Sequence, residues 1–514
     1  MNRTKKEKTL SLIALLSLAL ILLPLFAACG GGDKPAVTDK APETTAADAA
    51  GETTAEETEP ARKAPELPDA DYDGYDFRVL AMFSTTMGGW TQPGAHYWSD
   101  FGYNEERAGE PINDTVHARN MAIEEKYNVT IHLTEVSSVK TEAQKFIAAG
   151  DDTYDIITPI INDSFSMAQS GYLIDMYTIP YIDMTEPWWD DILCEKFGMG
   201  GHIYVATGDI SMEDEEYNCV TLFNKGMIGK FNLDDPYEAV HNGTLTLDFM
   251  YESGKKVTFD VDGDGVMTNT DSFGFGNDYT GGESFLFAAG ESIARLNADG
   301  VPEITILNER AVNVMEKLIA QFNDPNYMIW ASVIKEKFGI SANWNELNNM
   351  LFDGRLLYRP ANIYNIKQYR EMIDDFGMLP SPKYDEKQKD YKSSISSHAA
   401  TAISVPATNT DLERTGILLE SLAYASDAVR AAYYEVTLTG KYARDAESIE
   451  ILDVIFAARS YDIGKAFGWG NFTNIIYDSV KNNGGFVSSV EAAMPAAQAA
   501  MEKSYTTFME NIGQ

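Results

Sequence analysis

The sequence predicts an α/β protein with two lobes, and three observations support this class. Predicted strands and helices alternate between residues 75 and 159, a second region of strands and helices follows, and the chain is long enough for more than one small domain. Strands separated by helices pair in parallel and are covered by helices on both faces. We therefore expect each lobe to contain a mostly parallel sheet flanked by helices.

The first lobe is predicted to start with three strands and two helices. Hydrophobic periodicity places strands at residues 75–81, 129–134 and 154–159 and helices at 111–126 and 141–149. In such a sheet, ligands bind beyond the carboxyl ends of the strands. The sequence therefore predicts ligand contacts in the loops that follow the first and third strands, residues 82–98 and 160–164.

The second lobe is predicted from a similar but weaker pattern. It has strand candidates at 219–223 and 272–275 and a helix near 311–322. We expect the first lobe to comprise about 71–206 and 375–410, and the second about 213–370.

The last hundred residues are predicted to be mainly helical. The helices are expected at 412–425, 447–458 and 487–512, within a C-terminal region of residues 411–514. We expect them to brace the two lobes from behind.

The N-terminus has the pattern of an export signal. Basic residues from Arg3 to Lys8 precede an apolar run that ends at Phe26, and Ala27-Ala28-Cys29 follows. Residues 1–28 resemble the signal peptide of bacterial lipoproteins, with Phe26 where Leu is usual. This resemblance implies a lipid on Cys29 and a location on the outer face of the cell membrane. An ordinary secretory signal is the alternative.

Residues 29–70 are predicted to form an acidic, disordered tether. The segment from Gly30 to Asp69 has no aromatic residue and is rich in Ala, Thr, Glu, Asp and Pro, so it cannot bury a core. The folded body, residues 71–514, follows it.

Charge and cysteine content limit the possible partners. The formal net charge of -38 excludes nucleic-acid binding, since no basic surface remains for phosphates, and favours neutral or cationic small molecules. Besides Cys29 there are only Cys194 and Cys219, which form either one disulfide or two buried thiols. We expect thiols, because the sequence has no repeated cysteine framework.

Residues 260–271 match the twelve-residue calcium loop. Oxygen ligands are expected at positions 1, 3, 5, 7, 9 and 12 and glycine at position 6, which is Gly265. The predicted ligands are Asp260, Asp262, Asp264, Val266 (through its carbonyl), Thr268 and Asp271. Asp271 replaces the usual Glu, which predicts weak affinity, and no second loop follows to make a paired sensor, which predicts a structural role. A solvated turn without metal is the alternative.

Several short segments in this order resemble extracellular solute-binding proteins of family 1, the lipoproteins that capture ligands for ABC importers. The segments are residues 109–114 with Arg119 and Asn120, 187–190, 201–206, 222–225, 271–274 and 377–383. The resemblance implies a periplasmic-binding-protein-like type II fold, hinge closure on a ligand, transfer to membrane permease subunits and a monomeric protein. It also implies that the crossing at 207–212 is a hinge strand.

Candidate ligand contacts are flat aromatic rings and polar groups suited to a sugar. They are Trp90, Trp98, Asn162, Asp163, Asp209, Trp344, Arg359, Asn362 and Trp469. For each Trp, core packing is equally compatible with the sequence. Trp90 and Trp469 rank highest, because neighbouring glycines leave their rings open to approach. Trp188 and Trp189 are assigned to structure, and Arg359 is expected to pair with a protein carboxylate.

The resulting hypothesis is a carbohydrate-binding protein, most simply for an oligosaccharide, and not an enzyme. The alternatives are a binding protein for peptides or other polar solutes, a surface sensor or adhesin, and a secreted glycosidase. The sequence has no G-x-S-x-G, H-E-x-x-H or Walker-type motif.

Overall fold

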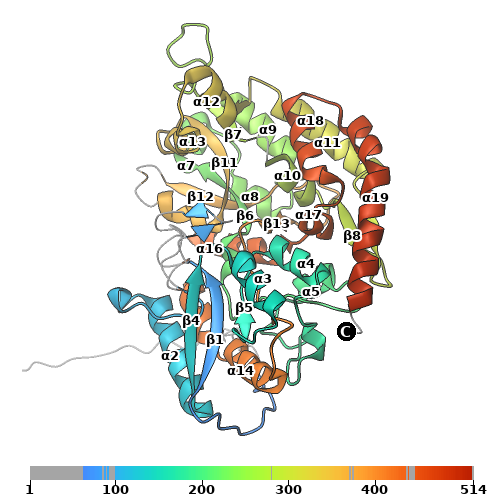
Figure 1. Ribbon diagram of the computed structural model, residues 1–514. Helices are drawn as coiled ribbons and strands as arrows, with labels where there is room; N and C mark the ends of the chain where they lie inside the picture. The colour runs from blue at the N-terminus through green and yellow to red at the C-terminus, as the bar shows by residue number, and fades with distance from the viewer. Residues whose placement is uncertain are drawn as a thin grey trace, which may run out of the picture. The chain divides into compact units, whose positions relative to one another are not determined.

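The computed structural model describes residues 62–83, 86–87, 90–91, 99–278, 281–369, 372, 375–435, 438 and 446–511. The predicted signal peptide, Cys29 and most of the predicted tether lie outside these residues. The compact unit spans Lys63–Gln514 and is built on two hydrophobic cores (Figure 1).

The first core surrounds a parallel sheet. Its strand order is β4 (Val129–Val136), β1 (Tyr75–Met82), β5 (Ile156–Ile157), and both pairs are parallel as predicted. β5 is shorter than expected. On its other side, Ile157 bridges Ser404 in antiparallel orientation, so a segment from late in the chain widens the sheet.

Two helices of the first core form where the sequence predicts them. α2 (Pro111–Tyr127) starts with a proline in its first turn, and α3 (Val139–Ala149) is capped by Ser138, whose hydroxyl accepts a hydrogen bond from the Thr141 amide. α3 ends at Gly150, which has φ = 75°. Figure 1 shows α2 beside β4, where the two elements are in contact.

The second core surrounds a five-stranded mixed sheet. Its order is β10 (Met328–Trp330), β7 (Phe273–Asn277), β11 (Leu356–Asn362), β6 (Cys219–Asn224), β12 (Phe376–Pro380). β7 is parallel to both neighbours, but β6 is antiparallel to both β11 and β12. The α/β class is confirmed, whereas the expectation of a mostly parallel second sheet is wrong. β12 also belongs to this sheet, although residues from about 375 were expected in the first lobe.

The C-terminal helices are shared between the cores instead of forming one layer behind them. α14 (Leu412–Tyr424) packs on α2, α16 (Ala446–Ala457) packs on β12, and α18 (Phe472–Lys481) contacts the second-core helices α10 and α11. α19 (Phe486–Asn511) contacts α4 and α11, and lies beside α18 in Figure 1. The three predicted helices are therefore present, with a different arrangement.

The remaining elements are short connections and covering helices. The strands are β2 (Thr86–Met87), β3 (Trp90–Thr91), β8 (Ala294–Leu296), β9 (Pro302–Ile304), β13 (Ser393–Ser394) and β14 (Arg459–Ser460). The helices are α4 (Ile161–Gln169), α5 (Asp191–Phe197), α6 (Glu213–Glu216), α7 (Lys225–Phe231), α8 (Pro236–His241), α9 (Leu247–Lys256), α10 (Gly282–Ala288), α11 (Glu309–Phe322), α12 (Ala331–Phe338), α13 (Asn343–Phe352), α15 (Asp427–Ala431) and α17 (Ile463–Phe467). The 3₁₀ helices are η1 (Glu105–Arg107), η2 (Met176–Thr178), η4 (Ile363–Tyr369) and η6 (Trp469–Asn471). Among the described helices, none is both long and apolar enough to cross a membrane.

The crossing at residues 207–212 is a turn and not the expected hinge strand. Gly208 has φ = 145° and bridges Trp189, and the Ser211 amide donates to the Gly208 carbonyl at 3.0 Å. A Cβ atom on Gly208 would lie 2.1 Å from the Trp188 carbonyl oxygen. The close approach of the segments around Trp188 and Gly208 therefore requires glycine at position 208 and prevents a longer strand.

Candidate functional site

A cavity of about 320 Å³ lies where α4 of the first core meets the segment from α17 to α18. Two predicted contacts, Asn162 and Trp469, line it together. The other polar residues of the lining are His398, Lys465, Asn471, Thr473 and Asn474. The lining thus combines amides, an imidazole and an ammonium with apolar side chains such as Ile293 and Phe472, the mixture typical of small-molecule sites.

Asn162 is held at the start of α4, just after the carboxyl end of β5. Its backbone amide donates to the Ser397 carbonyl at 3.2 Å, and its side-chain Nδ2 donates to Nδ1 of His398 at 3.0 Å. Its Oδ1 is buried and has no hydrogen-bond partner among the described residues. This oxygen is an acceptor that a bound hydroxyl group could satisfy.

His398 presents an imidazole to this cavity, in surroundings that favour the neutral ring. Burial lowers the pKa of His398, and the nearby Lys465 ammonium lowers it further. Because Nδ1 accepts from Asn162, the hydrogen of the neutral ring is assigned to Nε2. His398 therefore offers a hydrogen-bond donor.

Lys465 brings a paired charge to the same cavity. Its Nζ lies 2.5 Å from Oε1 of Glu283, and both side chains are buried. Burial alone would lower the pKa of Lys465, but Glu283 outweighs it and the pKa is raised. The α17 N-cap Asp462 fixes the backbone of Lys465 by accepting its amide hydrogen at 2.7 Å.

Trp469 lines the cavity but its ring is not open to approach, contrary to the expectation from its neighbouring glycines. Only 3% of the residue is exposed. The indole stacks on Phe467 at a centroid distance of 4.8 Å, and its Nε1 donates to Oγ of Ser504 on α19 at 2.9 Å. Gly468 and Gly470 both have positive φ, so they turn the chain instead of exposing the ring.

Three predicted contacts from the second core do not line this cavity. The Arg359 guanidinium stacks over Trp344 at 5.0 Å and donates to the Pro360 carbonyl at 2.8 Å, while its Nε has no partner among the described residues. Burial lowers the pKa of Arg359. Trp344 remains 42% exposed. The Asn362 side-chain oxygen accepts from the Cys219 thiol at 3.5 Å.

Two predicted carboxylates are already in ion pairs. Asp163 contacts Lys140 at 2.9 Å, and Asp209 contacts Arg430 at 3.3 Å. The structure describes only the backbone of Trp90, in β3, and Trp98 lies outside the described residues.

Trp188 and Trp189 are structural, as expected. Both are buried, and their indole Nε1 atoms each donate to one carboxylate oxygen of Glu420 at 3.0 Å. Burial raises the pKa of Glu420 to about 7 although both hydrogen bonds favour the ionised form.

The crossing contains a buried ionic network that sequence reasoning missed. Residues 213–216 (Glu-Asp-Glu-Glu) form the short helix α6, in which Asp214, Glu215 and Glu216 are at most 2% exposed. Glu215 lies 2.5 Å from Arg430 and 2.8 Å from Arg459, and Arg459 also contacts Asp214 at 3.1 Å. A run of four acids normally indicates solvent exposure. Asp214 and Glu215 are buried because Arg430 and Arg459, which lie far away in the sequence, pair with them.

The pKa values of the two central acids of the network, Asp214 and Glu215, are shifted in opposite directions. Burial and the neighbouring Glu215 raise the pKa of Asp214 well above its usual range. Burial also opposes ionisation of Glu215, but Arg430 and Arg459 lower its pKa to about 2.

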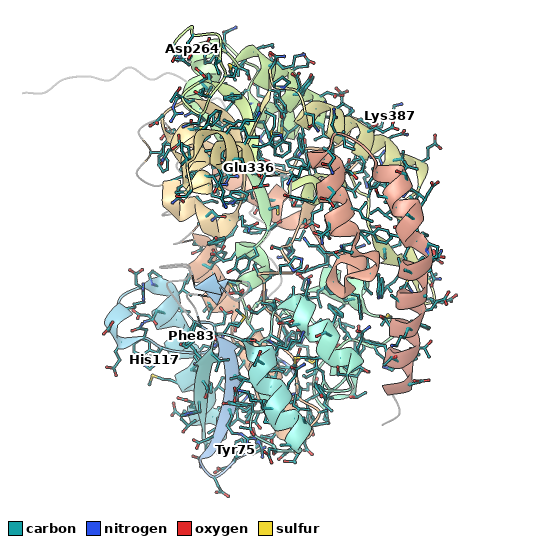
Figure 2. All side chains as sticks on the ribbon, turned by 45° about the horizontal axis from the view of Figure 1, so that its top comes forward. Tyr75, Phe83, His117, Asp264, Glu336 and Lys387 are labelled. Carbon is teal, nitrogen blue, oxygen red and sulfur yellow. The ribbon has the colours of Figure 1, made fainter. Side chains whose placement is uncertain are left out.

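The acidic loop 260–271 brings three of its predicted ligands together. Carboxylate oxygens of Asp260, Asp262 and Asp264 lie within 4.8 Å of one another. Asp260 accepts the amide hydrogens of Gly263 and Gly265, at 2.7 and 2.6 Å. Figure 2 shows Asp264 on this loop.

The last acid of the loop has another role. Both carboxylate oxygens of Asp271 accept backbone hydrogens, from Val261 at 2.9 Å and Thr268 at 2.7 Å, and the residue is 1% exposed. Asp271 therefore closes the loop and is not part of the three-carboxylate cluster.

The two cysteines of the folded unit are free thiols, as expected. Burial raises the pKa of Cys194 to about 11 and also raises that of Cys219. Neither thiol is therefore activated as a nucleophile.

Comparison with solved structures identifies the fold. The chain is similar to a cyclic α-maltosyl-1,6-maltose binding protein from Arthrobacter globiformis, with a TM-score of 0.55, 14% identity, and 84% of this chain and 99% of that chain covered. It is also similar to a cyclo/maltodextrin-binding protein complexed with maltotetraose, with a TM-score of 0.54, 13% identity, and coverage of 86% and 99%. A third similar structure is UspC of M. tuberculosis, with a TM-score of 0.52, 14% identity, and coverage of 82% and 99%.

These similarities define the class of architecture: the chain has the two-lobed type II fold of periplasmic-binding-protein-like structures. No protein-family model matches the sequence, and no curated protein matches it. Because the identities are 13 to 14%, the similarity shows the fold alone.

Proposed function

We propose that this chain is the substrate-binding component of an ABC importer and captures an oligosaccharide in the cavity beside Asn162 and Trp469. The observation that carries the proposal is the convergence of Asn162 from the first core with His398, Lys465 and Trp469 from the C-terminal half in one polar cavity. Two structures of the same fold are named for the maltodextrins or cyclic maltosyl sugars that they bind.

The chemistry of the cavity suits a neutral polyhydroxylated ligand. Lys465 is already paired with Glu283, and His398 is neutral, so neither attracts an ionic ligand strongly. Asn162 supplies an acceptor and His398 a donor, and hydroxyl groups of a sugar satisfy both. Closure of the two lobes on the ligand would then bury it between them.

Binding without catalysis is part of the proposal. Glu283 is paired with Lys465 and Asp163 with Lys140, while Asp462 accepts the amide hydrogens of Ile293 and Lys465. A glycosidase requires one carboxylic acid and one free carboxylate across the scissile bond. Turnover of an oligosaccharide by the purified protein would contradict this reading.

The central experiment is a thermal-shift screen of maltooligosaccharides, cyclic glucans and peptides, followed by calorimetry. A saccharide at 100 times its Kd should stabilise the protein by about 2.7 kcal/mol. Asn162→Ala should weaken saccharide binding, whereas Gln498→Ala, which removes an exposed amide on α19, should not. A shift with peptides and none with saccharides would replace the sugar by a peptide.

We also propose the lipid anchor on Cys29 and a place on the outer face of the cell membrane beside the permease. The sequence pattern of residues 1–30 supports this proposal. The test is the mass of the mature protein: a chain that begins at Cys29 and carries acyl groups supports it, and an unmodified N-terminus overturns it.

Calcium in the loop 260–271 is a further part of the proposal. The three clustered carboxylates and the turn at Gly265, with φ = 83°, fit the ligand positions 1, 3, 5 and the glycine of position 6. Bound Ca²⁺ would neutralise carboxylates that repel one another and so stabilise the approach to β7. Asp271 would contribute by holding the loop closed.

A further inference from the structure

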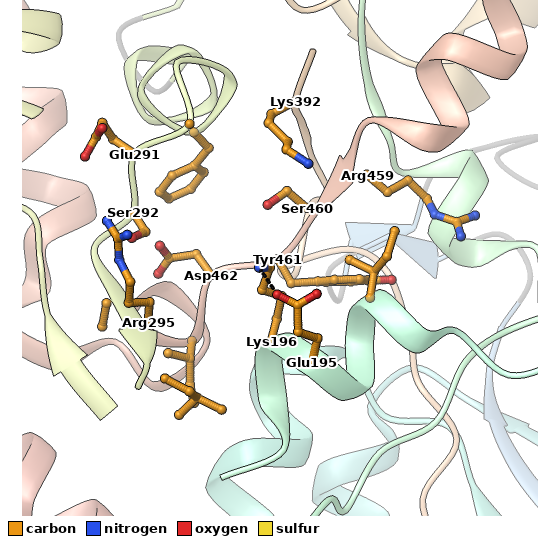
Figure 3. Close-up of a pocket in the computed structure, with 16 residues that line it drawn as sticks. Glu195, Lys196, Glu291, Ser292, Arg295, Lys392, Arg459, Ser460, Tyr461 and Asp462 are labelled. Carbon is orange, nitrogen blue, oxygen red and sulfur yellow. Dashed lines mark hydrogen bonds and ion pairs between the residues drawn. The ribbon is translucent and has the colours of Figure 1, made fainter. Parts of the chain in front are cut away.

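A second cavity, of about 280 Å³, lies between α5, the segment 287–296 and β14 (Figure 3). It is distinct from the cavity beside Asn162 and Trp469, because the two cavities share no lining residue. The cavity beside Asn162 alone is lined by Ile293 and by the α17 residues Gly464 and Lys465.

Three acids line this second cavity, and each is already engaged. Glu291 contacts Nε of Arg310 at 3.2 Å and accepts from Asn308 at 2.7 Å. Asp462 accepts the amide hydrogens of Ile293 and Lys465, each at 2.7 Å. Glu195 pairs with its neighbour Lys196 at 2.6 Å.

The cations of the lining are not all engaged. Arg459 is paired with Glu215 and Asp214, and Figure 3 shows its guanidinium turned away from two further cations of the lining. Those two are Lys392 and Arg295, which have no ion pair or side-chain hydrogen bond within the part of the chain that the structure describes. Glu303, opposite Arg295 in the β8–β9 register, accepts instead from Asn297 at 2.9 Å.

Two cations without an acidic partner among the described residues thus line one cavity of a chain whose net charge is -38. Arg295 is exposed and Lys392 is half-buried, so both side chains are open to a ligand. Lys392, Arg295, Ser460 and Ser292 all line the cavity, and in the view of Figure 3 Lys392 and Ser460 lie on a different side from Arg295 and Ser292. Apolar side chains, among them Phe287, complete the lining.

We propose that this cavity binds a small organic dianion, with one anionic group at Lys392 and Ser460 and the other at Arg295 and Ser292. Carboxylate and phosphate groups share the required chemistry, because both accept charge-assisted hydrogen bonds from ammonium and guanidinium donors. The body of the ligand would cover Phe287. This proposal does not depend on the oligosaccharide site proposed beside Asn162 and Trp469.

The test is isothermal titration calorimetry of the purified protein at low ionic strength, where screening is weak. The probes are succinate, glycerol 2-phosphate, inorganic phosphate, acetate and the neutral erythritol. We expect saturable binding of succinate or glycerol 2-phosphate at one site, weaker binding of acetate and none of erythritol. The relative affinities of succinate and glycerol 2-phosphate decide between carboxylate and phosphate as the preferred group.

Variants locate the site. Lys392→Gln and Arg295→Gln should each weaken binding of the dianion about tenfold, as expected for loss of one charge-assisted contact. Lys387→Gln, which neutralises an exposed lysine labelled in Figure 2, should change nothing. Melting curves of all three variants confirm folding. The proposal is overturned if no probe binds the wild-type protein at millimolar concentration, or if the Lys392→Gln/Arg295→Gln double variant binds as tightly as the wild type.

Discussion

The ionic network at the crossing gives the sharpest test of the structure, through the variant Arg459→Met. Arg459 lies 2.8 Å from Glu215 and 3.1 Å from Asp214, and only 12% of its side chain is exposed. Methionine fills a similar space without charge. The variant therefore leaves buried carboxylates with one counter-ion, Arg430, where the wild type has two.

The expected cost follows from this burial. Removing one partner of a buried ion pair destabilises a protein by about 3–5 kcal/mol, because the remaining charge stays desolvated. The folded unit Lys63–Gln514 has an unfolding entropy of about 2.1 cal/mol/K per residue, or roughly 0.95 kcal/mol/K in total. The midpoint of thermal unfolding should therefore fall by about 3–5 °C.

The assay is differential scanning calorimetry at pH 7 with two comparison variants. Lys145→Met removes a lysine whose side chain is 65% exposed in its pair with Glu142, itself 40% exposed, and should lower the midpoint by at most about 1 °C. Adding Glu215→Gln to Arg459→Met should recover part of the loss, because it removes the ionised carboxylate that Arg459 contacts at 2.8 Å. An Arg459→Met midpoint within 1 °C of wild type, or no recovery in the double variant, would refute the reasoning.

The remaining predictions concern the turn, the buried acid and the two proposed sites. Gly208→Ala should fail to fold or lose more than about 2 kcal/mol of stability in urea unfolding, because its Cβ would overlap the Trp188 carbonyl; normal stability would contradict the crossing geometry. The pKa of Glu420 is raised from 4.5 to about 7, so its contribution to the free energy of unfolding is fully present below pH 4.5 and is lost as pH rises through 7. The melting temperature should therefore fall between these pH values, and a Glu420→Gln variant should show a flatter dependence on pH. Ca²⁺ should raise the melting temperature of wild type but not of Asp262→Asn, measured with and without chelator; equal responses would exclude the loop as the site. Asn162→Ala should weaken saccharide binding about 2- to 10-fold by calorimetry, and unchanged affinity would remove Asn162 from the site.

Local patterns were sufficient to predict the elements of the first core. The apolar spacing in 111–126 and the glycine after Ala149 are short-range signals, and the observed α2 and α3 agree with them within a few residues. The pairing of β6 with β11 and β12 was not predictable in the same way. Strand direction depends on long-range partners, and here β12 returns from more than 150 residues later in the chain to pair antiparallel with β6.

The candidate site was predictable only in part. Asn162 was found because it directly follows a predicted strand, and Trp469 because an aromatic ring between glycines is conspicuous. Lys465, His398 and Glu283 carry no such signal, because a lysine, a histidine and a glutamate are ordinary surface residues until another element covers them. The acids of α6 were missed for the same reason, because acidic residues are ordinary surface residues until another element covers them.

The sequence by itself determined the α/β class, the three clustered acids of the loop 260–271 and the candidate contacts that follow the strands. These features depend on residues close together in the chain, where spacing and backbone preference act directly. Only the tertiary structure decided that the two thiols are free, that the ring of Trp469 is buried, that Asp209 is paired with Arg430, and that Lys392 and Arg295 have no acidic partner among the described residues. Burial and charge pairing arise when distant segments meet, and in a chain with 78 acidic and 40 basic residues composition alone cannot specify which charges pair.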